Sequence, residues 1–123
     1  MTSTPVFLLV EPAPILRSSL HAWLDRTLSG HRILVAADGM EALRLVAQER
    51  PSHILLEMEL PQNTGFVVLR QMRHFLPDAK IIATSWFDNS FLLKNLLLAG
   101  ADGFVRKNKV PRELLSLWDV PLK

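Results

Sequence analysis

Short apolar runs alternate with longer amphipathic segments along almost the whole chain. The runs have the length of strands, but they lack the polar residue at every second position that marks a strand with one solvated face. They lie at residues 6–10, 33–36, 54–56, 81–83 and 104–105. Continuous apolar runs of this kind are typical of parallel strands that are covered on both faces. A parallel sheet between two layers of helices is therefore expected.

The segments between these runs carry helical signals. Residues 14 to about 30 place apolar side chains on one face, and Pro14 is tolerated in a first helical turn. Asp38 is followed three positions later by Glu41, a pattern that caps a helix, and Pro51 would end that helix. The other expected helices are residues 65–76, residues 88–99 and a short segment from Pro111. The alternation of strand and helix, five times over, predicts a doubly wound (βα)5 fold of the α/β class.

The size and composition of the chain limit its function classes. Its 123 residues suit one domain, which we expect to cover residues 1–123. Lys and Arg number 14 against 12 Asp and Glu, an excess too small to indicate a nucleic-acid or membrane surface. Cysteine is absent, which excludes disulfides, thiolate metal sites and a Cys nucleophile. Because no apolar segment reaches membrane-spanning length, we expect a soluble cytoplasmic protein.

In open sheets of this kind the working crevice lies beyond the carboxyl ends of the strands. The residues expected there are Glu11 and Pro12, residues 57–61, Thr84 and Ser85, and Arg106 and Lys107. Several of them are charged or hydroxyl-bearing, so this edge of the sheet is the expected functional site.

Four stretches at these strand ends resemble the motifs of response-regulator receiver domains of the chemotaxis-regulator type. They are residues 8–12 (LLVEP), 55–61 (LLEMELP), 81–85 (IIATS) and 100–107 (GADGFVRK). The resemblance extends from residue 5 to about residue 118. It implies a flavodoxin-like, five-stranded parallel sheet of strand order 2-1-3-4-5 and a role in two-component (phosphorelay) signal transduction. It also implies a protein partner, which would be a sensor kinase, an output domain or a second copy in a homodimer.

Two residues depart from the family pattern. In receivers with full chemistry, two acids and an acceptor aspartate hold Mg²⁺, and the aspartate attacks phosphorus. Pro12 stands where the second acid is expected and offers no ligand, and Glu57 stands at the acceptor position. The extra methylene of Glu57 moves its carboxylate by roughly 1 Å, a misplacement that can cost ~100-fold in rate. The chain therefore resembles a pseudo-receiver that works without phosphorylation or a Mg²⁺ cofactor, its degenerate acidic pocket formed by Glu11, Pro12 and Glu59.

Lys107 matches the lysine that pairs with the phosphoryl group in the family, and here we expect it to pair with Glu57. Under this hypothesis Glu57 is a permanent, partial mimic of phosphoaspartate. An alternative is that Glu57 is a relic in a solvated cleft. Another alternative retains phosphorylation, with Glu57 as an unusual acceptor and Mg²⁺ held by Glu11, Glu57 and the backbone carbonyl of Glu59.

Thr84 and Phe104 match the hydroxyl and aromatic positions whose coupled rotation reports activation in the family. Each also has an ordinary interpretation, Thr84 as a β-branched residue at a strand end and Phe104 as a core aromatic. The resemblance therefore assigns switch roles to Thr84, Phe104 and Lys107, which the residue types alone do not require.

Consecutive leucines in the expected fourth helix indicate a contact surface. Neighbouring helical positions are separated by about 100°, so three in a row cannot all face the sheet. The resemblance places the output and dimerisation surface on the fourth helix, the fifth strand and the fifth helix. The residues expected at this interface are Trp86, Leu92, Leu93, Leu96, Leu97 and Leu98.

No other chemistry is indicated by the sequence. It contains no Walker glycine loop, no Gly-x-Ser-x-Gly elbow and no His-Glu-x-x-His pair, and its four histidines lack metal-ligand spacing. We therefore expect no enzymatic activity. The basic residues near residue 107 are typical of a solvated loop, and without a recognition helix we expect no nucleic-acid or membrane binding by this domain. A further alternative is that the chain is the receiver part of a longer transcription regulator or kinase.

Overall fold

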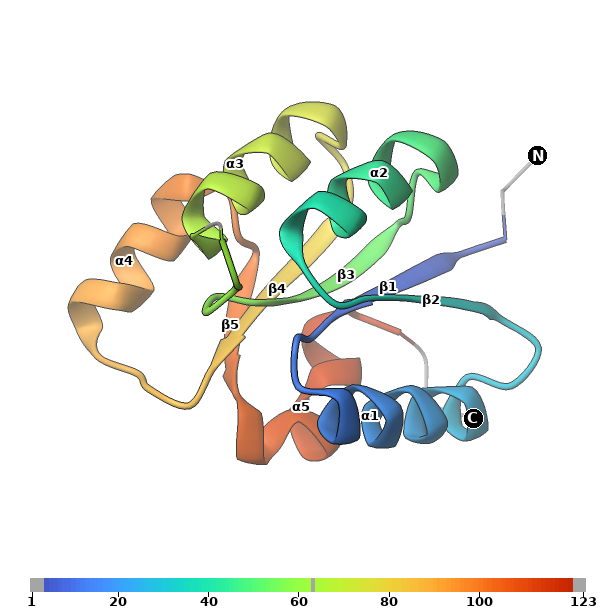
Figure 1. Cartoon of the computed structure of the whole chain (residues 1–123). Helices are drawn as coiled ribbons and strands as arrows, with labels where there is room; N and C mark the ends of the chain where they lie inside the picture. The colour runs from blue at the N-terminus through green and yellow to red at the C-terminus, as the bar shows by residue number, and fades with distance from the viewer. Residues whose placement is uncertain (1–3, 63, 121–123) are drawn as a thin grey trace.

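Five strands form one parallel sheet in the part of the chain that the computed structural model describes, residues 4–62 and 64–120 (Figure 1). The strands are β1 (Val6–Val10), β2 (Arg32–Ala36), β3 (His53–Glu57), β4 (Lys80–Ser85) and β5 (Gly103–Arg106). Their order is β2-β1-β3-β4-β5, and every neighbouring pair is parallel. The predicted (βα)5 flavodoxin-like fold and its strand order are therefore confirmed.

Helices cover both faces of this sheet. They are α1 (Pro14–Thr27), α2 (Gly39–Glu49), α3 (Gly65–Phe75), α4 (Ser90–Ala99) and α5 (Val110–Leu117). Figure 1 shows α1 and α5 on one face and α2, α3 and α4 on the other. Each face buries its own apolar cluster, as expected for strands that are apolar on both sides. None of the helices in the described ranges is long and apolar enough to cross a membrane.

The helix starts follow the capping signals, with some corrections to the expected bounds. The Asp38 carboxylate accepts a hydrogen bond from the Glu41 amide at 2.8 Å, as expected. The fourth helix begins at Ser90 and not at residue 88, because the Asn89 side chain caps it by accepting from the Leu92 amide. The fifth begins at Val110, one residue earlier than expected, after a 3-10 turn at Lys107–Lys109. The first helix, α1, ends at Thr27, which is earlier than the expected end near Gly30.

The connection between β3 and α3 depends on Gly65. A Cβ atom at this position would lie 2.5 Å from the Cα and carbonyl oxygen of Met58, far inside van der Waals contact. The Gly65 amide also donates to the Met58 carbonyl at 3.0 Å. Only glycine therefore permits this close approach, which fixes the backbone just after Glu57.

An aromatic cluster packs at the other end of the strands, where β1 and β3 begin. The Phe7 ring stacks on His53 with 4.8 Å between centroids, and Trp118 meets His53 edge-on at 5.9 Å. The Trp118 indole N–H donates to the Ile54 carbonyl at 3.1 Å, which anchors the end of α5 to β3. Burial lowers the pKa of the His53 imidazole, and the charges of Lys80 and His31 lower it further.

This lowered pKa predicts an acid-sensitive fold. The unfolded chain binds a proton at His53 near pH 6.5, whereas the folded protein resists protonation until lower pH, so stability falls as the pH drops below about 6.5. Urea unfolding between about pH 7.5 and about pH 5 should show this decline, and His53→Phe should flatten it. Exposed His74 provides the control, because His74→Gln should leave the slope unchanged. An unchanged slope in His53→Phe would contradict the assignment.

Candidate functional site

The residues expected at the crevice meet at the carboxyl ends of the strands. Glu11 follows β1 directly, Glu57 is the last residue of β3, Thr84 is its register partner in β4, and Lys107 follows β5. Glu11, Glu57 and Thr84 are each at most 2% exposed. The parallel sheet therefore brings these side chains to one buried position, as the sequence predicted.

Lys107 bridges the two carboxylates. Its ammonium Nζ lies 2.8 Å from Glu11 Oε1 and also forms an ion pair with Glu57 Oε1. The Lys107 side chain is itself buried, so the bridge is largely shielded from solvent. The expected pairing of Lys107 with Glu57 is confirmed. The second partner, Glu11, was predicted to belong to the acidic pocket and, in one alternative, to hold Mg²⁺, but not to pair with Lys107.

The other two carboxylate oxygens are also engaged. Glu11 Oε2 accepts a hydrogen bond from the Ala13 amide at 2.9 Å, and Glu57 Oε2 accepts one from the Glu59 amide at 3.1 Å. Backbone amides just after β1 and β3 thus hold the carboxylates that Lys107 bridges. We call the unit of Glu11, Glu57 and Lys107 the charge triad.

The charge triad does not fit a divalent cation. All four carboxylate oxygens have protein partners, and the ammonium lies between the two acids where a metal ion would need to lie. Pro12 adds no oxygen ligand from its side chain. Within residues 4–62 and 64–120, no group of three or more His, Asp and Glu side chains is placed to hold a metal. A cation would first have to displace Lys107.

Burial and pairing act in opposite directions on the ionisation of the triad. Burial raises the pKa of the Glu57 carboxyl, and the hydrogen bonds from Lys107 and from the Glu59 amide offset this only in part. For Lys107, burial lowers the pKa, but the contacts with Glu11 and Glu57 outweigh it and raise the pKa above its ordinary value. Lys107 therefore stays protonated at neutral pH.

Trp86 contacts the charge triad at Lys107. Its ring centroid lies 5.5 Å from the Lys107 ammonium, within the range of a cation–π contact. About half of the Trp86 residue surface remains exposed. Trp86 was predicted to lie on the interface around the fourth helix, and the structure adds this contact with the crevice.

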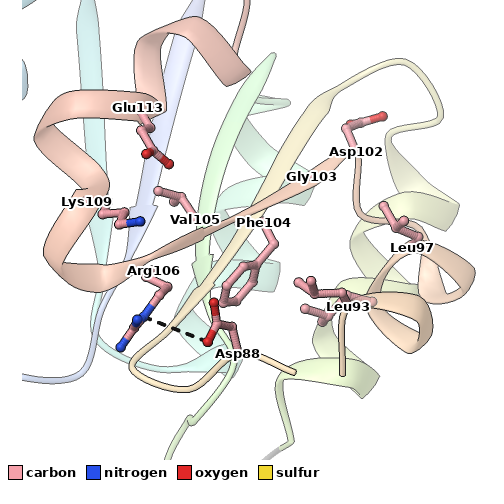
Figure 2. Close-up of a pocket in the computed structure, with 11 residues that line it drawn as sticks. Asp88, Leu93, Leu97, Asp102, Gly103, Phe104, Val105, Arg106, Lys109 and Glu113 are labelled. Carbon is pink, nitrogen blue, oxygen red and sulfur yellow. Dashed lines mark ion pairs between the residues drawn. The ribbon is translucent and has the colours of Figure 1, made fainter. Parts of the chain in front are cut away.

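The two positions with an expected switch role differ in their surroundings. The Thr84 hydroxyl is buried and has no hydrogen-bond partner among the residues that the structure describes. Phe104 is half-buried, and its ring points into a hollow between α4, β5 and α5, toward Leu93 and Asp88 (Figure 2). Arg106 approaches Asp88 across the same hollow at 4.0 Å. Thr84 and Phe104 therefore lie on two sides of the strand pair β4 and β5 with distinct environments.

Comparison with known proteins identifies the family. A sequence model of the response regulator receiver domain matches residues 7–119. The chain belongs to the response-regulator receiver family. A transcriptional activator protein of Pseudomonas putida, ExaE, is 32% identical to this receiver over 109 residues, which are 89% of this chain and 51% of that protein. The receiver thus spans about half the length of the curated relatives it matches.

Solved structures agree with this assignment. A LuxR-family two-component response regulator from an Aurantimonas species is 30% identical and superimposes with a TM-score of 0.82, over 93% of this receiver and 81% of that chain. A response regulator from Burkholderia pseudomallei superimposes with a TM-score of 0.86 at 21% identity, over 94% of this receiver and 67% of that chain. That structure contains a phosphorylated aspartic acid and a calcium ion. At this identity, the similarity to the Burkholderia pseudomallei structure shows a shared fold only.

The sequence-based prediction is wrong for one residue of the expected interface. Leu96 is 1% exposed and packs in the core beneath α4, so it contributes no surface to this receiver. Leu97 and Leu98 are exposed, whereas Leu92 and Leu93 are half-buried. The consecutive leucines of α4 therefore divide between the core and solvent, as the helical period requires.

Proposed function

We propose that this chain is a cytoplasmic response-regulator receiver that signals through protein–protein contact without accepting a phosphoryl group and without Mg²⁺. The observation that carries the proposal is the Lys107 bridge between Glu11 and Glu57. In the family's chemistry these same positions would serve a metal ion and a phosphoryl group. In this chain the side chains of Glu11, Glu57 and Lys107 contact one another at these positions instead.

Phosphoryl transfer would require this unit to come apart. A phosphoryl group attached to Glu57 would need Lys107 as its counter-ion, and the attack would need a cation to neutralise the phosphoryl oxygens. Freeing Lys107 for that purpose leaves the buried carboxylate of Glu11 without its partner, which is costly in a site shielded from water. The charge triad therefore favours its own closed arrangement over the reactive one.

The same arrangement supports the hypothesis that Glu57 imitates a phosphorylated acceptor. Its carboxylate draws Lys107 into the crevice, as a phosphoryl group would. A carboxylate carries one negative charge, whereas a phosphoryl group carries about two, so the imitation is incomplete. We propose that Glu57 sets a single, constitutive state of the receiver.

The partner surface that we propose is the face formed by α4, β5 and α5. It contains a hollow of about 470 Å³ into which Leu93, Leu97 and Phe104 project beside the charged Arg106 and Glu113 (Figure 2). An apolar floor with a charged rim is the usual composition of a transient protein interface. Several relatives, ExaE among them, are named as transcription regulators. We therefore propose a transcription output domain as the partner, with a sensor kinase and a second copy as the other candidates.

Incubation with a small acyl phosphate and Mg²⁺ tests the proposal. We expect intact-mass spectrometry to detect no added phosphoryl group and titration calorimetry to detect no Mg²⁺ binding, because the triad occupies both positions. The matched control is Glu57→Ala, which removes the only acceptor carboxylate proposed for this site. A mass gain in the natural protein that disappears in Glu57→Ala would overturn the proposal and establish Glu57 as an acceptor.

A further inference from the structure

A second hollow, of about 570 Å³, lies between α3 and α4. Leu93 and Leu97 line the hollow of Figure 2, whereas Leu92 and Leu98 line this one, so α4 separates the two. Most of its lining is apolar, with Phe66 contributed by α3 and Phe91, Leu92 and Leu98 by α4. We call this hollow the α3/α4 groove.

Two large apolar residues of this groove are mostly exposed. Phe91 is 78% exposed and Leu98 is 76% exposed, and they lie two helical turns apart on α4. Single exposed apolar residues are common, but two large ones beside an apolar groove mark a surface that a partner covers. The ten residues of α4 span about 15 Å, which matches just under three turns of a docked helix.

The charges around the groove have one sign. The segments of α3 and α4 contain Arg70, Arg73, His74 and Lys94 and no Asp or Glu. Arg73 is engaged, because it pairs with Asp102 at 2.7 Å. Within the described residues Arg70, which lines the groove, and Lys94 form no ion pair. Arg70 in the lining of the groove, and Lys94 within one helical turn of Phe91 and Leu98 on α4, are therefore the two cations available to an occupant.

The side chains of the neutral polar residues of the groove form hydrogen bonds with the backbone of α4. The Asn89 side chain caps α4, and the Asn95 side-chain amide donates to the Phe91 carbonyl at 2.7 Å. Recognition of an occupant would thus depend on apolar contact and on Arg70 and Lys94. Both features call for a ligand with an apolar stripe and negative charges beside it.

We propose that the α3/α4 groove binds an acidic amphipathic helix of a protein partner. Such a helix would place apolar residues at i, i+3/i+4 and i+7 against Phe91 and Leu98, and carboxylates against Arg70 and Lys94. A second copy of this receiver fits less well, because two α4 helices packed about a two-fold axis would face each other with lysine and without an acid. The groove lies outside the α4-β5-α5 face, so the inference goes beyond the proposed function.

Two synthetic peptides test this inference. Each is about 14 residues long with leucines at helical spacing, and they differ only in carrying Glu or Lys on the polar face. Fluorescence anisotropy should show that the Glu peptide binds the natural protein at least about tenfold more tightly than the Lys peptide, with affinity falling as salt is added. The variant Arg70→Glu with Lys94→Glu should reverse this preference.

Surface variants locate the binding on the protein. Leu98→Ser should weaken the Glu peptide about tenfold or more, whereas Leu97→Ser, on the other side of α4, should leave it unchanged. Equal binding of the two peptides, or no effect of Leu98→Ser, would overturn the proposal. Sedimentation that shows a dimer disrupted by Leu98→Ser would also overturn it, because the occupant would then be a second copy.

Discussion

Replacing Lys107 with methionine is expected to lower the free energy of unfolding by about 3–5 kcal/mol at neutral pH. Methionine retains much of the lysine's apolar stem, so the change removes chiefly the charge. Glu11 and Glu57 would then face each other in a buried position without a cation. Breaking a buried ion pair is costly because an uncompensated charge remains. Chemical denaturation followed by circular dichroism measures the loss.

Two comparisons make this experiment decisive. Lys109→Met, an exposed lysine in the same turn, should change stability by no more than about 0.5 kcal/mol. Adding Glu11→Gln and Glu57→Gln to Lys107→Met should recover most of the loss, since the carboxylates are then neutral. A Lys107→Met protein as stable as the natural one would show that the triad does not form in solution.

The pH dependence of Lys107→Met follows from the same charges. Burial already raises the pKa of Glu57 in the natural protein, and loss of Lys107 removes the hydrogen bond that opposes this rise. In the folded variant the Glu57 carboxyl then binds a proton more tightly than it does in the unfolded chain. The contribution of Glu57 to the stability of the variant should therefore increase as the pH falls toward the ordinary carboxyl range, so the gap to the natural protein should narrow.

Restoring two aspartates is expected to produce a phosphorylatable receiver. In the variant Glu57→Asp with Pro12→Asp, the loss of one methylene withdraws the acceptor carboxylate from Lys107 by roughly 1 Å. The new acid at residue 12 supplies the missing oxygen ligand beside Glu11, and carboxylates with water form the usual Mg²⁺ site. On incubation with a small acyl phosphate, whose carboxylate is the leaving group, and Mg²⁺, we expect intact mass to show no added phosphoryl group in the natural protein and one in the variant.

The single variants separate the two contributions. Glu57→Asp alone should react far more slowly, because the metal position still lacks an acid, and Pro12→Asp alone should not react, because Glu57 still holds Lys107. Misplacement of a reacting group by about 1 Å costs on the order of 100-fold, so the double variant should exceed either single variant by at least that factor. Equal behaviour of all three proteins would show that another feature, such as the Trp86 contact with Lys107, blocks the reaction.

The sequence predicted the fold well because the decisive signal is local. Five apolar runs of strand length, separated by helices with caps and glycine or proline ends, permit few arrangements other than a doubly wound sheet. The pairing of Lys107 with Glu57 followed from placing both at strand ends. The partner role of Glu11 did not follow, because it depends on side-chain reach across β1, β3 and β5.

The errors on α4 have a common physical origin. The helical period of α4 is visible in the sequence, but which face points inward is not, since seven of its ten residues are Leu, Phe or Ala without a clear polar face. The inward side could therefore not be chosen, and Leu96 was assigned to the surface that it does not reach. Likewise, nothing in the sequence alone shows that the ring of Trp86 lies over Lys107, because this depends on the path of the loop after β4.

The charge triad also bears on how the chain folds. Glu11 follows the first strand and Lys107 follows the last, so their contact closes almost the longest loop that this chain contains. Contacts between residues so distant in sequence form only after most of the chain is ordered. An early, partly folded intermediate would therefore hold two buried acids without their cation, which disfavours its accumulation. In this receiver the ion pair between Glu11 and Lys107 thus couples the first and last strands and increases the cooperativity of folding.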